Sequence, residues 1–327
     1  MREIKIGAND AGQRVDRFLK KYFEKANLSF IYKNLRKKNI TVNGKKIKPE
    51  DELQENDIIK MFLSEETIEK FKREPVNLKS SKFPKVIYED DNIIIIEKKA
   101  GILSHNASKN YEPNCVDSII DYLIAKQEYN PRLENSFRPA IVNRLDRNTS
   151  GLLIGAKNAK ALRELNTAIK ENFIHKYYIT LCRGEVKNGF RDISYLVKDE
   201  KNNKVTVKSK WEKGAKESIT EFDVIAKNKD YSLLKVNLIT GRTHQIRTTL
   251  NSNHHEIVGD RKYGKESVNE YFIKKYKYNS QFLHNYKVEF KSLQQDLSYL
   301  NGKVFYSSLP ELEESIIKDI FGDIILK

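Results

Sequence analysis

The sequence predicts an α+β protein of two domains, in which a small basic α/β-type module precedes a larger domain built on a mixed, largely antiparallel sheet. Three observations support this fold class. The chain has 327 residues, more than one ordinary domain needs. Its N-terminal part combines short helical and strand-like patterns, and its later part is rich in strand formers of alternating polarity. We expect the module at residues 1–63, a polar linker at 64–84, and the larger domain at 85–327.

The module should begin with a strand, because residues 1–6 alternate between charged and apolar side chains. An amphipathic helix follows, whose i, i+3, i+4, i+7 spacing places on one face Val15, Phe18, Leu19 and Tyr22. Ser29 can cap a second helix that runs to Lys38. Residues 40–47 then predict a hairpin, since Asn43-Gly44 supplies the positive φ angles that a two-residue turn needs.

Basic residues continue from the second helix into this hairpin, so their summed field should lie on one surface, formed by Lys33, Arg36, Lys37, Lys38, Lys45 and Lys46. Such a surface binds phosphate backbones with strong salt dependence and little sequence preference. The alternative is an ordinary solvated helix face.

The larger domain should open with a hairpin of two strands joined by a turn at residues 90–92. The apolar run Ile93 to Ile96 suggests that its second strand is covered on both faces. We expect helices at 115–126 and 159–171, with a strand at 151–157 between them. Further strands are expected at 177–181, 205–207, 218–225 and 232–238, and a peripheral helical tail at 309–327.

Charge and cysteine content limit the partners and the compartment. Sixty Lys and Arg against 45 Asp and Glu give a net charge of +15 and a pI near 9.4, which favours a polyanionic partner, unless lysine is simply abundant throughout the proteome. The two cysteines have no metal or disulfide spacing and favour a reducing compartment. The N-terminus lacks a secretion signal and no run is long enough to span a membrane, so we expect a soluble, cytoplasmic protein.

Asp146 is the candidate catalytic residue. It lies between Arg144 and Arg147 in a polar turn that leads into the strand expected at 151–157. Positive neighbours within a few ångströms favour the ionised carboxylate, which suits a nucleophile or a base better than an acid. Loops held by a core strand often carry catalytic residues. The alternative is that Asp146 only caps a turn or forms a structural salt bridge.

Two segments far apart in the sequence carry a resemblance to a known family. Residues 144–152 read Arg-Leu-Asp-Arg-Asn-Thr-Ser-Gly-Leu, and residues 241–247 read Gly-Arg-Thr-His-Gln-Ile-Arg. Together they resemble the RluA-type pseudouridine synthases, whose first motif reads His-Arg-Leu-Asp-x-x-Thr-Ser-Gly-Leu. The second segment matches the family in full. The first departs only at its opening position, where Asn143 replaces histidine and cannot titrate near neutrality.

The resemblance implies an enzyme that isomerises uridine to pseudouridine within RNA, by detaching the base from ribose, turning it and rejoining it through carbon five. It implies that Asp146 is the essential carboxylate and that Arg247 is its charge partner. Tyr178, in Lys176-Tyr177-Tyr178, would pack its ring against the target base. Whether the carboxylate adds to the ring, adds to the sugar or removes a proton to give a glycal stays open. Because no redox change, phosphate transfer or hydrolysis occurs, the resemblance implies no cofactor and no metal.

Further matches suggest RNA contacts and scaffold. We expect contacts with RNA at Arg144, Arg147, Arg242 and His244, although the last two could instead shape their own loop. Residues 259–264, Gly-Asp-Arg-Lys-Tyr-Gly, and residues 282–284, Phe-Leu-His, match family motifs that we interpret mainly as scaffold. The chain also departs from the family pattern at Lys99, which replaces proline, and at Asn285, which replaces alanine.

The N-terminal module resembles an S-four-type RNA-binding domain at residues 14–19, 31–38 and 42–45. Members with this domain pairing typically modify large-subunit ribosomal RNA, which is therefore the expected substrate, and we expect a monomer. The alternative is a non-catalytic RNA-binding or ribosome-assembly factor that has kept the fold. A glycoside hydrolase is disfavoured, because such enzymes ordinarily need a pair of carboxylates and only one is prominent here.

Overall fold

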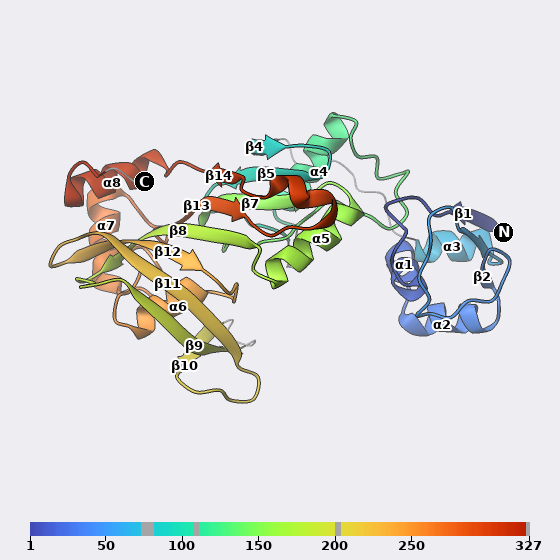
Figure 1. The fold of residues 1–327 in the computed structure, drawn as a ribbon, viewed down its shortest axis with the longest axis horizontal. Helices are drawn as coiled ribbons and strands as arrows, with labels where there is room; N and C mark the ends of the chain where they lie inside the picture. The colour runs from blue at the N-terminus through green and yellow to red at the C-terminus, as the bar shows by residue number, and fades with distance from the viewer. Residues whose placement is uncertain (73–81, 107–110, 200–203, 325–327) are drawn as a thin grey trace.

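The structure, a computed structural model, describes residues 1–72, 82–106, 111–199 and 204–324. In this described part, the N-terminal module is an antiparallel sheet with the strand order β1-β3-β2, packed against short helices (Figure 1). Its strands are β1 (Arg2–Lys5), β2 (Ile40–Val42) and β3 (Ile58–Met61), and its helices are α1 (Val15–Tyr22), α2 (Leu28–Arg36) and α3 (Glu65–Phe71). The four apolar residues predicted to line α1 are all buried in the module core.

Two details of the module differ from the expectation. Asn27, rather than Ser29, caps α2, because its side chain accepts a hydrogen bond from Phe30 N at 2.8 Å. The Asn43-Gly44 turn forms with the expected positive φ angles of 51° and 74°. However, residues 45–47 form no return strand beyond one bridge between Val42 and Lys45. β2 pairs instead with β3, whose Ile59 and Met61 are fully buried and give the sheet its apolar face.

The expected linker at residues 64–84 contains a helix, α3, where a connecting segment was predicted. Ser64 caps it by accepting a hydrogen bond from Thr67 N. Glu65 and Glu66 lie in its first turn, where their negative charges interact favourably with the positive end of the helix dipole. Ile68 is fully buried in the module core. The module therefore extends at least to Phe71, and residues 73–81 of the expected linker lie outside the described residues.

Polar side chains dock the module onto the larger domain. Asp10 is buried and accepts hydrogen bonds from Ser136 Oγ at 2.6 Å and Asn135 Nδ2 at 2.8 Å. Asn9 Nδ2 donates to Glu134 at 2.9 Å. Buried, satisfied hydrogen bonds of this kind favour one relative placement of the two parts over others.

The larger domain is built on an eleven-stranded sheet with the order β10-β9-β11-β12-β8-β13-β7-β5-β4, in which β14 also pairs with β13 and β6 with β7. The strands are β4 (Lys85–Glu89), β5 (Ile93–Lys98), β6 (Ala140–Ile141), β7 (Ser150–Ala156), β8 (Ile174–Arg183), β9 (Phe190–Asp199), β10 (Lys204–Lys208), β11 (Lys216–Lys227), β12 (Tyr231–Leu238), β13 (Leu283–Phe290) and β14 (Val304–Tyr306). All described pairings are antiparallel except β13 with β7, so the predicted mixed, largely antiparallel sheet is confirmed.

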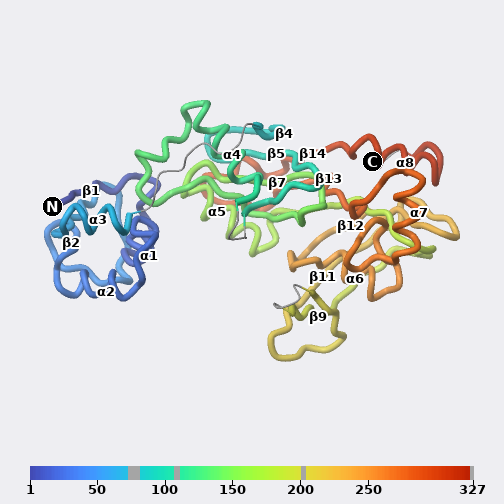
Figure 2. Tube along the Cα trace, turned by 180° about the vertical axis from the view of Figure 1, so that it is seen from behind, coloured from blue at the N-terminus to red at the C-terminus, as the bar shows by residue number. Residues whose placement is uncertain are grey.

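Helices pack against both faces of the sheet. They are α4 (Cys115–Ala125), α5 (Ala159–Lys170), α6 (Gln245–Ser252), α7 (Glu266–Tyr276) and α8 (Glu311–Phe321), with a short 3-10 helix at Gln295–Leu300. Ile94 and Ile96 pack into the cluster that contains α4, whereas Ile93 and Ile95 pack into the cluster that contains α5. The prediction that this strand is covered on both faces is confirmed. Seen from behind, α6 and α7 lie beside β11 and β12 (Figure 2).

β13 joins the two halves of the sheet, because it pairs with β7 on one side and with β8 on the other. The sequence analysis did not identify it as a strand. Its parallel pairing with β7 requires a glycine at position 151, where φ is +111° and an added Cβ would lie 2.2 Å from Asn285 O. Glycine thus lets the strand that follows Asp146 approach its neighbour closely.

The C-terminal helix forms as expected, but it is more than a peripheral tail. Ile316 and Ile317 of α8 are buried in the main core, and buried Glu313 accepts a hydrogen bond from Tyr278 at 2.9 Å. In the described part of the chain, no helix combines the length and apolarity that crossing a membrane would require.

Candidate active site

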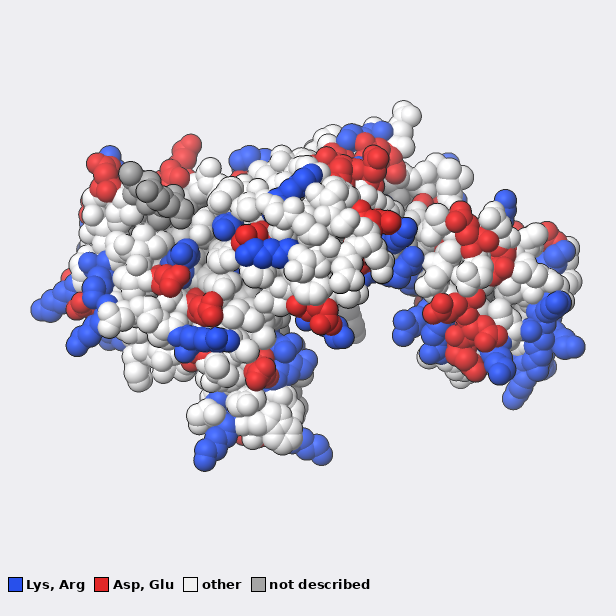
Figure 3. Space-filling view, viewed as in Figure 1, with Lys and Arg blue, Asp and Glu red and all other residues white. Residues whose placement is uncertain are grey.

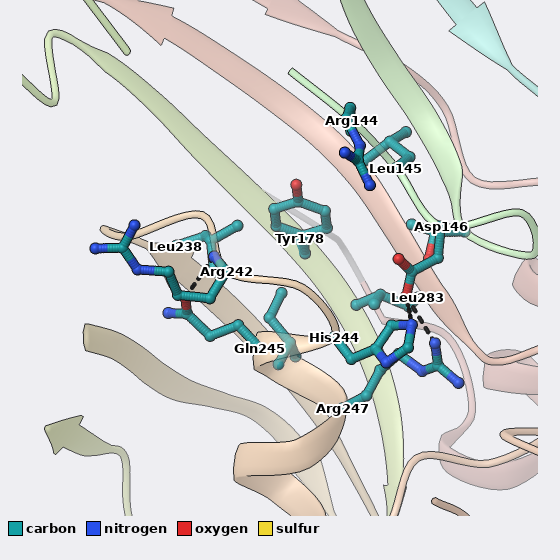
Figure 4. Close-up of a pocket in the computed structure, with 12 residues that line it drawn as sticks. Arg144, Leu145, Asp146, Tyr178, Leu238, Arg242, His244, Gln245, Arg247 and Leu283 are labelled. Carbon is teal, nitrogen blue, oxygen red and sulfur yellow. Dashed lines mark hydrogen bonds and ion pairs between the residues drawn. The ribbon is translucent and has the colours of Figure 1, made fainter. Parts of the chain in front are cut away.

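A pocket lies where the loop before β7, the middle of β8 and the start of α6 meet (Figure 4). Its apolar floor is formed by Leu145, Leu238 and Leu283. Six of the predicted site residues line it, namely Asp146, Tyr178, Arg144, Arg242, His244 and Arg247. Asp146 and Arg247, which are 101 positions apart in the sequence, are therefore brought into one site.

Asp146 is held at the pocket edge by its own turn, in which Thr149 N donates to Asp146 O at 3.1 Å. Its side chain is 30% exposed, so a substrate can reach the carboxylate. Arg247 Nη1 donates to Asp146 Oδ2 at 2.7 Å, which confirms the predicted contact between these two residues. The two arginines that flank Asp146 in the sequence have other surroundings in the structure. Arg147 instead donates to Glu112 at 2.7 Å, and the exposed Arg144 lines the pocket.

Arg247 is fixed by a second carboxylate, Asp260, which lies behind it. Its Nε and Nη2 donate to the two Asp260 oxygens at 2.7 and 2.8 Å, a fork that leaves Nη1 directed at Asp146. Burial lowers the pKa of Arg247, but the hydrogen bonds and charge of Asp260 outweigh burial and raise it overall. Burial likewise raises the pKa of Asp260, and the contact with Arg247 lowers it overall. Both groups are therefore held in their charged forms.

Asp260 is a functional residue that the sequence analysis assigned to scaffold. Its Oδ1 also accepts hydrogen bonds from the backbone N–H groups of Lys262 and Tyr263, which fix the carboxylate behind Arg247. The only signal in the sequence was the Gly-Asp pair at 259–260. The contact of Asp260 with Arg247 forms because the loop after α6 folds back onto that helix.

His244 stands beside Asp146, with Nε2 at 4.0 Å from Asp146 Oδ2. Its Nδ1 lies 2.9 Å from Tyr263 Oη, and that hydroxyl already accepts a hydrogen bond from Val205 N. The Tyr263 hydroxyl can donate its proton to His244 Nδ1, and in the tautomer that accepts this bond the imidazole proton is on Nε2, the nitrogen that faces Asp146. Burial lowers the pKa of His244, so the neutral imidazole is favoured. The residue both shapes its loop and lines the pocket, with φ at +55° where α6 begins.

Tyr178 is buried on β8 and presents its ring to the pocket (Figure 4). Tyr177 does not line the pocket, as expected for a neighbour on the same strand. Tyr177 lies under Lys287 and donates to Glu289 at 3.4 Å. Burial, reinforced by the charge of Asp146, raises the pKa of Tyr178 and keeps its hydroxyl neutral. Lys176 does not reach the pocket, since its ammonium is buried against Ile174 O at 3.1 Å.

The loop that carries Asp146 is anchored on both sides. The buried ammonium of Lys98 donates to Arg147 O at 2.8 Å, and Ser104 Oγ donates to Leu145 O at 2.6 Å. Asn143, which replaces the family histidine, accepts from Ile154 N at 2.8 Å and donates to Leu152 O at 3.1 Å. It is buried and does not line the pocket, so its contacts are those of a residue that shapes the loop.

Arg242 is fixed at the opposite side of the pocket. Its Nε donates to Glu217 O at 2.9 Å and its backbone N donates to Gln245 Oε1 at 3.0 Å. The six basic residues predicted on the module are all exposed, but they lie in the separate N-terminal module rather than in the pocket. Figure 3 shows Lys and Arg along the edges of this module, with Asp and Glu on part of the same face.

The pocket is suited to carboxylate chemistry on a planar ring. Asp146 is the one carboxylate among the described residues that line it, since Asp260 is buried behind Arg247. A pair of carboxylates flanking a glycosidic bond is thus not formed, in agreement with the argument against a glycoside hydrolase. Within the described ranges, no group of three or more His, Cys, Asp or Glu side chains is arranged to hold a metal ion.

Comparisons with known proteins agree with this geometry. A family model described as RNA pseudouridylate synthase matches residues 92–252. The chain is 35% identical over 310 residues to an uncharacterized RNA pseudouridine synthase of Mycoplasma capricolum, with 93% of this chain and 96% of that protein covered. It is 34% identical over 295 residues to ribosomal large subunit pseudouridine synthase C of Vibrio vulnificus, with coverage of 88% and 87%. The solved structure of human RNA pseudouridylate synthase domain containing 4 shares the fold, at a TM-score of 0.55 and 19% identity, over 71% of this chain and 91% of that one.

Proposed function

Because the chain belongs to the RNA pseudouridylate synthase family, we propose that it converts uridines of large-subunit ribosomal RNA to pseudouridine, with Asp146 as the catalytic carboxylate. The observation that supports this most directly is the accessible carboxylate of Asp146, held by Arg247 at 2.7 Å beside the ring of Tyr178. The ribosomal substrate is inferred from relatives whose names specify the large ribosomal subunit.

The reaction needs the target uridine to leave the base stack and enter the pocket. Extrusion of a base costs a few kcal/mol. Stacking on an aromatic ring contributes about 1–3 kcal/mol per base. Tyr178 can therefore offset much of the extrusion cost, and Leu145, Leu238 and Leu283 exclude water from the base.

Within the pocket, Asp146 acts on the flipped nucleotide while Arg247 orients its carboxylate through the hydrogen bond from Nη1. The bond between ribose C1′ and base N1 breaks, and a bond between C1′ and base C5 forms. The C5 proton is lost and N1 gains one, so atoms and electrons balance within the nucleotide and we expect no cofactor. Addition to the ring, addition to the sugar and glycal formation each begin with an ionised carboxylate.

We propose further that the N-terminal module, extended to Phe71, is an S-four-type domain that docks folded RNA. Its exposed basic residues on α2 and the following turn can pair with phosphates without selecting a sequence. The polar docking of Asp10 onto Ser136 and Asn135 would hold this surface at a fixed distance from the pocket.

The test is position-by-position mapping of pseudouridine in ribosomal and transfer RNA from cells with the protein, without it, and with only Asp146→Asn. Asp91→Asn, at an exposed turn away from the pocket, is the matched control. We expect particular large-subunit sites to vanish in the deletion and Asp146→Asn strains and to remain in the control. If the map is unchanged in the deletion strain, the synthase proposal fails and a non-catalytic RNA-binding or assembly factor becomes the better description. Loss of transfer RNA sites instead would refute the ribosomal substrate.

A further inference from the structure

Strands β9, β10 and β11 form an arm at one end of the sheet, and the loop at residues 209–215 projects from it in both views (Figures 1 and 2). Trp211 lies in this loop with 67% of its surface exposed. It is the single tryptophan of the chain. A large aromatic side chain left exposed at the end of a projecting loop does not stabilise the core, and exposed aromatic residues are often binding contacts.

The surroundings of Trp211 are strongly basic. Residues 204–216 contain one carboxylate, Glu212, and five exposed lysines, at positions 204, 208, 210, 213 and 216. Glu212 pairs with Lys208 at 3.5 Å, so most of the positive charge is left without an acidic partner in the segment. An exposed ring among lysines is the combination that binds single-stranded nucleic acid, because the ring stacks on a base and the ammonium groups contact phosphates.

Two adjoining hollows lie between the arm and the active site. Gly214 and Lys216, at the base of the loop, line a hollow together with Arg242 and Thr243. Thr243 also lines the neighbouring hollow that contains Asp146. Arg242 is fixed to the arm through Glu217 O at 2.9 Å, so the hollow is anchored to the sheet at its base.

We propose that Trp211 stacks on an unpaired base of the substrate RNA, in the strand that flanks the target uridine and passes over these two hollows. Lys210 and Lys213 contact the phosphates on either side of that base. This inference rests on the proposed function in one respect, which is that the ligand is RNA. A protein partner is the competing occupant, and the unbalanced positive charge and the link to the catalytic hollow favour RNA over it.

The single tryptophan makes a direct measurement possible. Indole fluorescence of the full-length protein would be followed while single-stranded oligouridylate is added, with inorganic polyphosphate as a polyanion that has no bases. We expect saturable quenching by the oligonucleotide and none by polyphosphate, since only a base can stack on the ring. Equal quenching by both, or no quenching at saturating oligonucleotide, would overturn the proposal.

Variants extend the test to affinity. Trp211→Ala should weaken oligouridylate binding by about 5-fold to about 150-fold, and Trp211→Phe should retain most of the affinity. Lys210→Gln with Lys213→Gln should reduce the slope of log affinity against log salt by about 1.4. Tyr306→Ala, an exposed aromatic residue on β14, is the control and should bind like the wild type. Unchanged affinity in Trp211→Ala, or loss only of binding to a ribosomal protein, would overturn the assignment to RNA.

The test of RNA binding by Trp211 can be distinguished from the test of catalysis by Asp146. On protein-free large-subunit ribosomal RNA, Trp211→Ala should raise the RNA concentration needed for half-maximal modification and leave the rate at saturation within about twofold, as expected for uniform binding. Asp146→Asn should show the opposite pattern, with wild-type quenching and no modification. A saturated rate in Trp211→Ala that falls as far as in Asp146→Asn would contradict a role confined to binding.

Discussion

Replacing Asp260 should impair both stability and catalysis, although this residue does not line the pocket. Asp260 is fully buried and neutralises Arg247 through two hydrogen bonds at 2.7 and 2.8 Å. In Asp260→Ala the guanidinium stays buried and keeps only Asp146, a partly exposed partner. Removing one member of a buried ion pair costs about 3–5 kcal/mol. A whole protein is stable by only about 5–15 kcal/mol, so Asp260→Ala removes a large part of that stability and Asp260→Asn is the milder probe.

Asp260→Asn keeps the shape of the side chain and one oxygen that can still accept from Lys262 N or Tyr263 N. It loses the charge and one arm of the fork, for which we expect about 1.5–3 kcal/mol of destabilisation. Arg247 is then free to turn away from Asp146. A displacement of about 1 Å at a reacting group can cost about 100-fold in rate, and we expect a loss of that order in the rate at saturating RNA.

Urea denaturation followed by circular dichroism would give the stability, and single-turnover pseudouridine formation on large-subunit ribosomal RNA would give the rate. Arg247→Lys offers a second probe, because lysine keeps a positive charge but cannot bridge Asp146 and Asp260 with a planar fork. The exposed Asp91→Asn serves as the control for loss of one carboxylate. Wild-type stability together with a wild-type rate in Asp260→Asn would refute the reasoning that Asp260 positions Arg247.

Three further predictions concern buried side chains. Tyr178→Phe should retain most of the modification rate in a single-turnover assay and Tyr178→Leu should lose it, if the ring acts by stacking. Burial lowers the pKa of Lys176 to about 8, so the folded state releases its proton before the unfolded state does, and wild-type stability should rise between pH 8 and about 10.5. Lys176→Met should therefore raise the free energy of unfolding, measured by urea denaturation, by about 1–3 kcal/mol below pH 8 and by less at higher pH. An increase that does not vary with pH would contradict this. Burial raises the pKa of Glu313 to about 7 despite its bond from Tyr278, so stability should fall as pH rises from 4.5 to 7. The melting temperature of Glu313→Gln should exceed that of the wild type at pH 8 and match it near pH 4.5.

Local sequence patterns were sufficient to predict a helix or strand, and its buried face, where the spacing of its own apolar residues determines that face. The apolar stripe of α1 and the uninterrupted run at Ile93–Ile96 each specify which faces are buried, and the structure buries those faces. The short helix α3 was missed because its seven residues are mostly charged and a single buried residue, Ile68, joins them to the core. Its cap at Ser64 was the available signal.

The central strand β13 could not be inferred in the same way, because its position depends on pairings with β7 and β8, which lie more than a hundred residues earlier in the chain. Contacts between distant segments also explain why only part of the site was predicted. Motif resemblance identified Asp146, Tyr178 and Arg247, but the hydrogen bonds that orient Arg247 come from a loop whose fold no local pattern specifies. Conversely, Arg144 and Arg147 were expected to act on Asp146 through their nearby positive charge, but Arg147 pairs with Glu112 instead.

Two departures from the RluA-type pattern are connected in space. Asn143 replaces a histidine and Asn285 replaces an alanine, and both side-chain amides donate to one carbonyl, Leu152 O, at 3.1 and 3.0 Å. A carbonyl oxygen has two lone pairs and can accept both bonds. The two amides reach this carbonyl from different elements, Asn143 from the loop that carries Asp146 and Asn285 from β13. Asn143 therefore ties the Asp146 loop to β7, and Asn285 ties β13 to the same point of β7, so both substituted positions support the strand that follows Asp146.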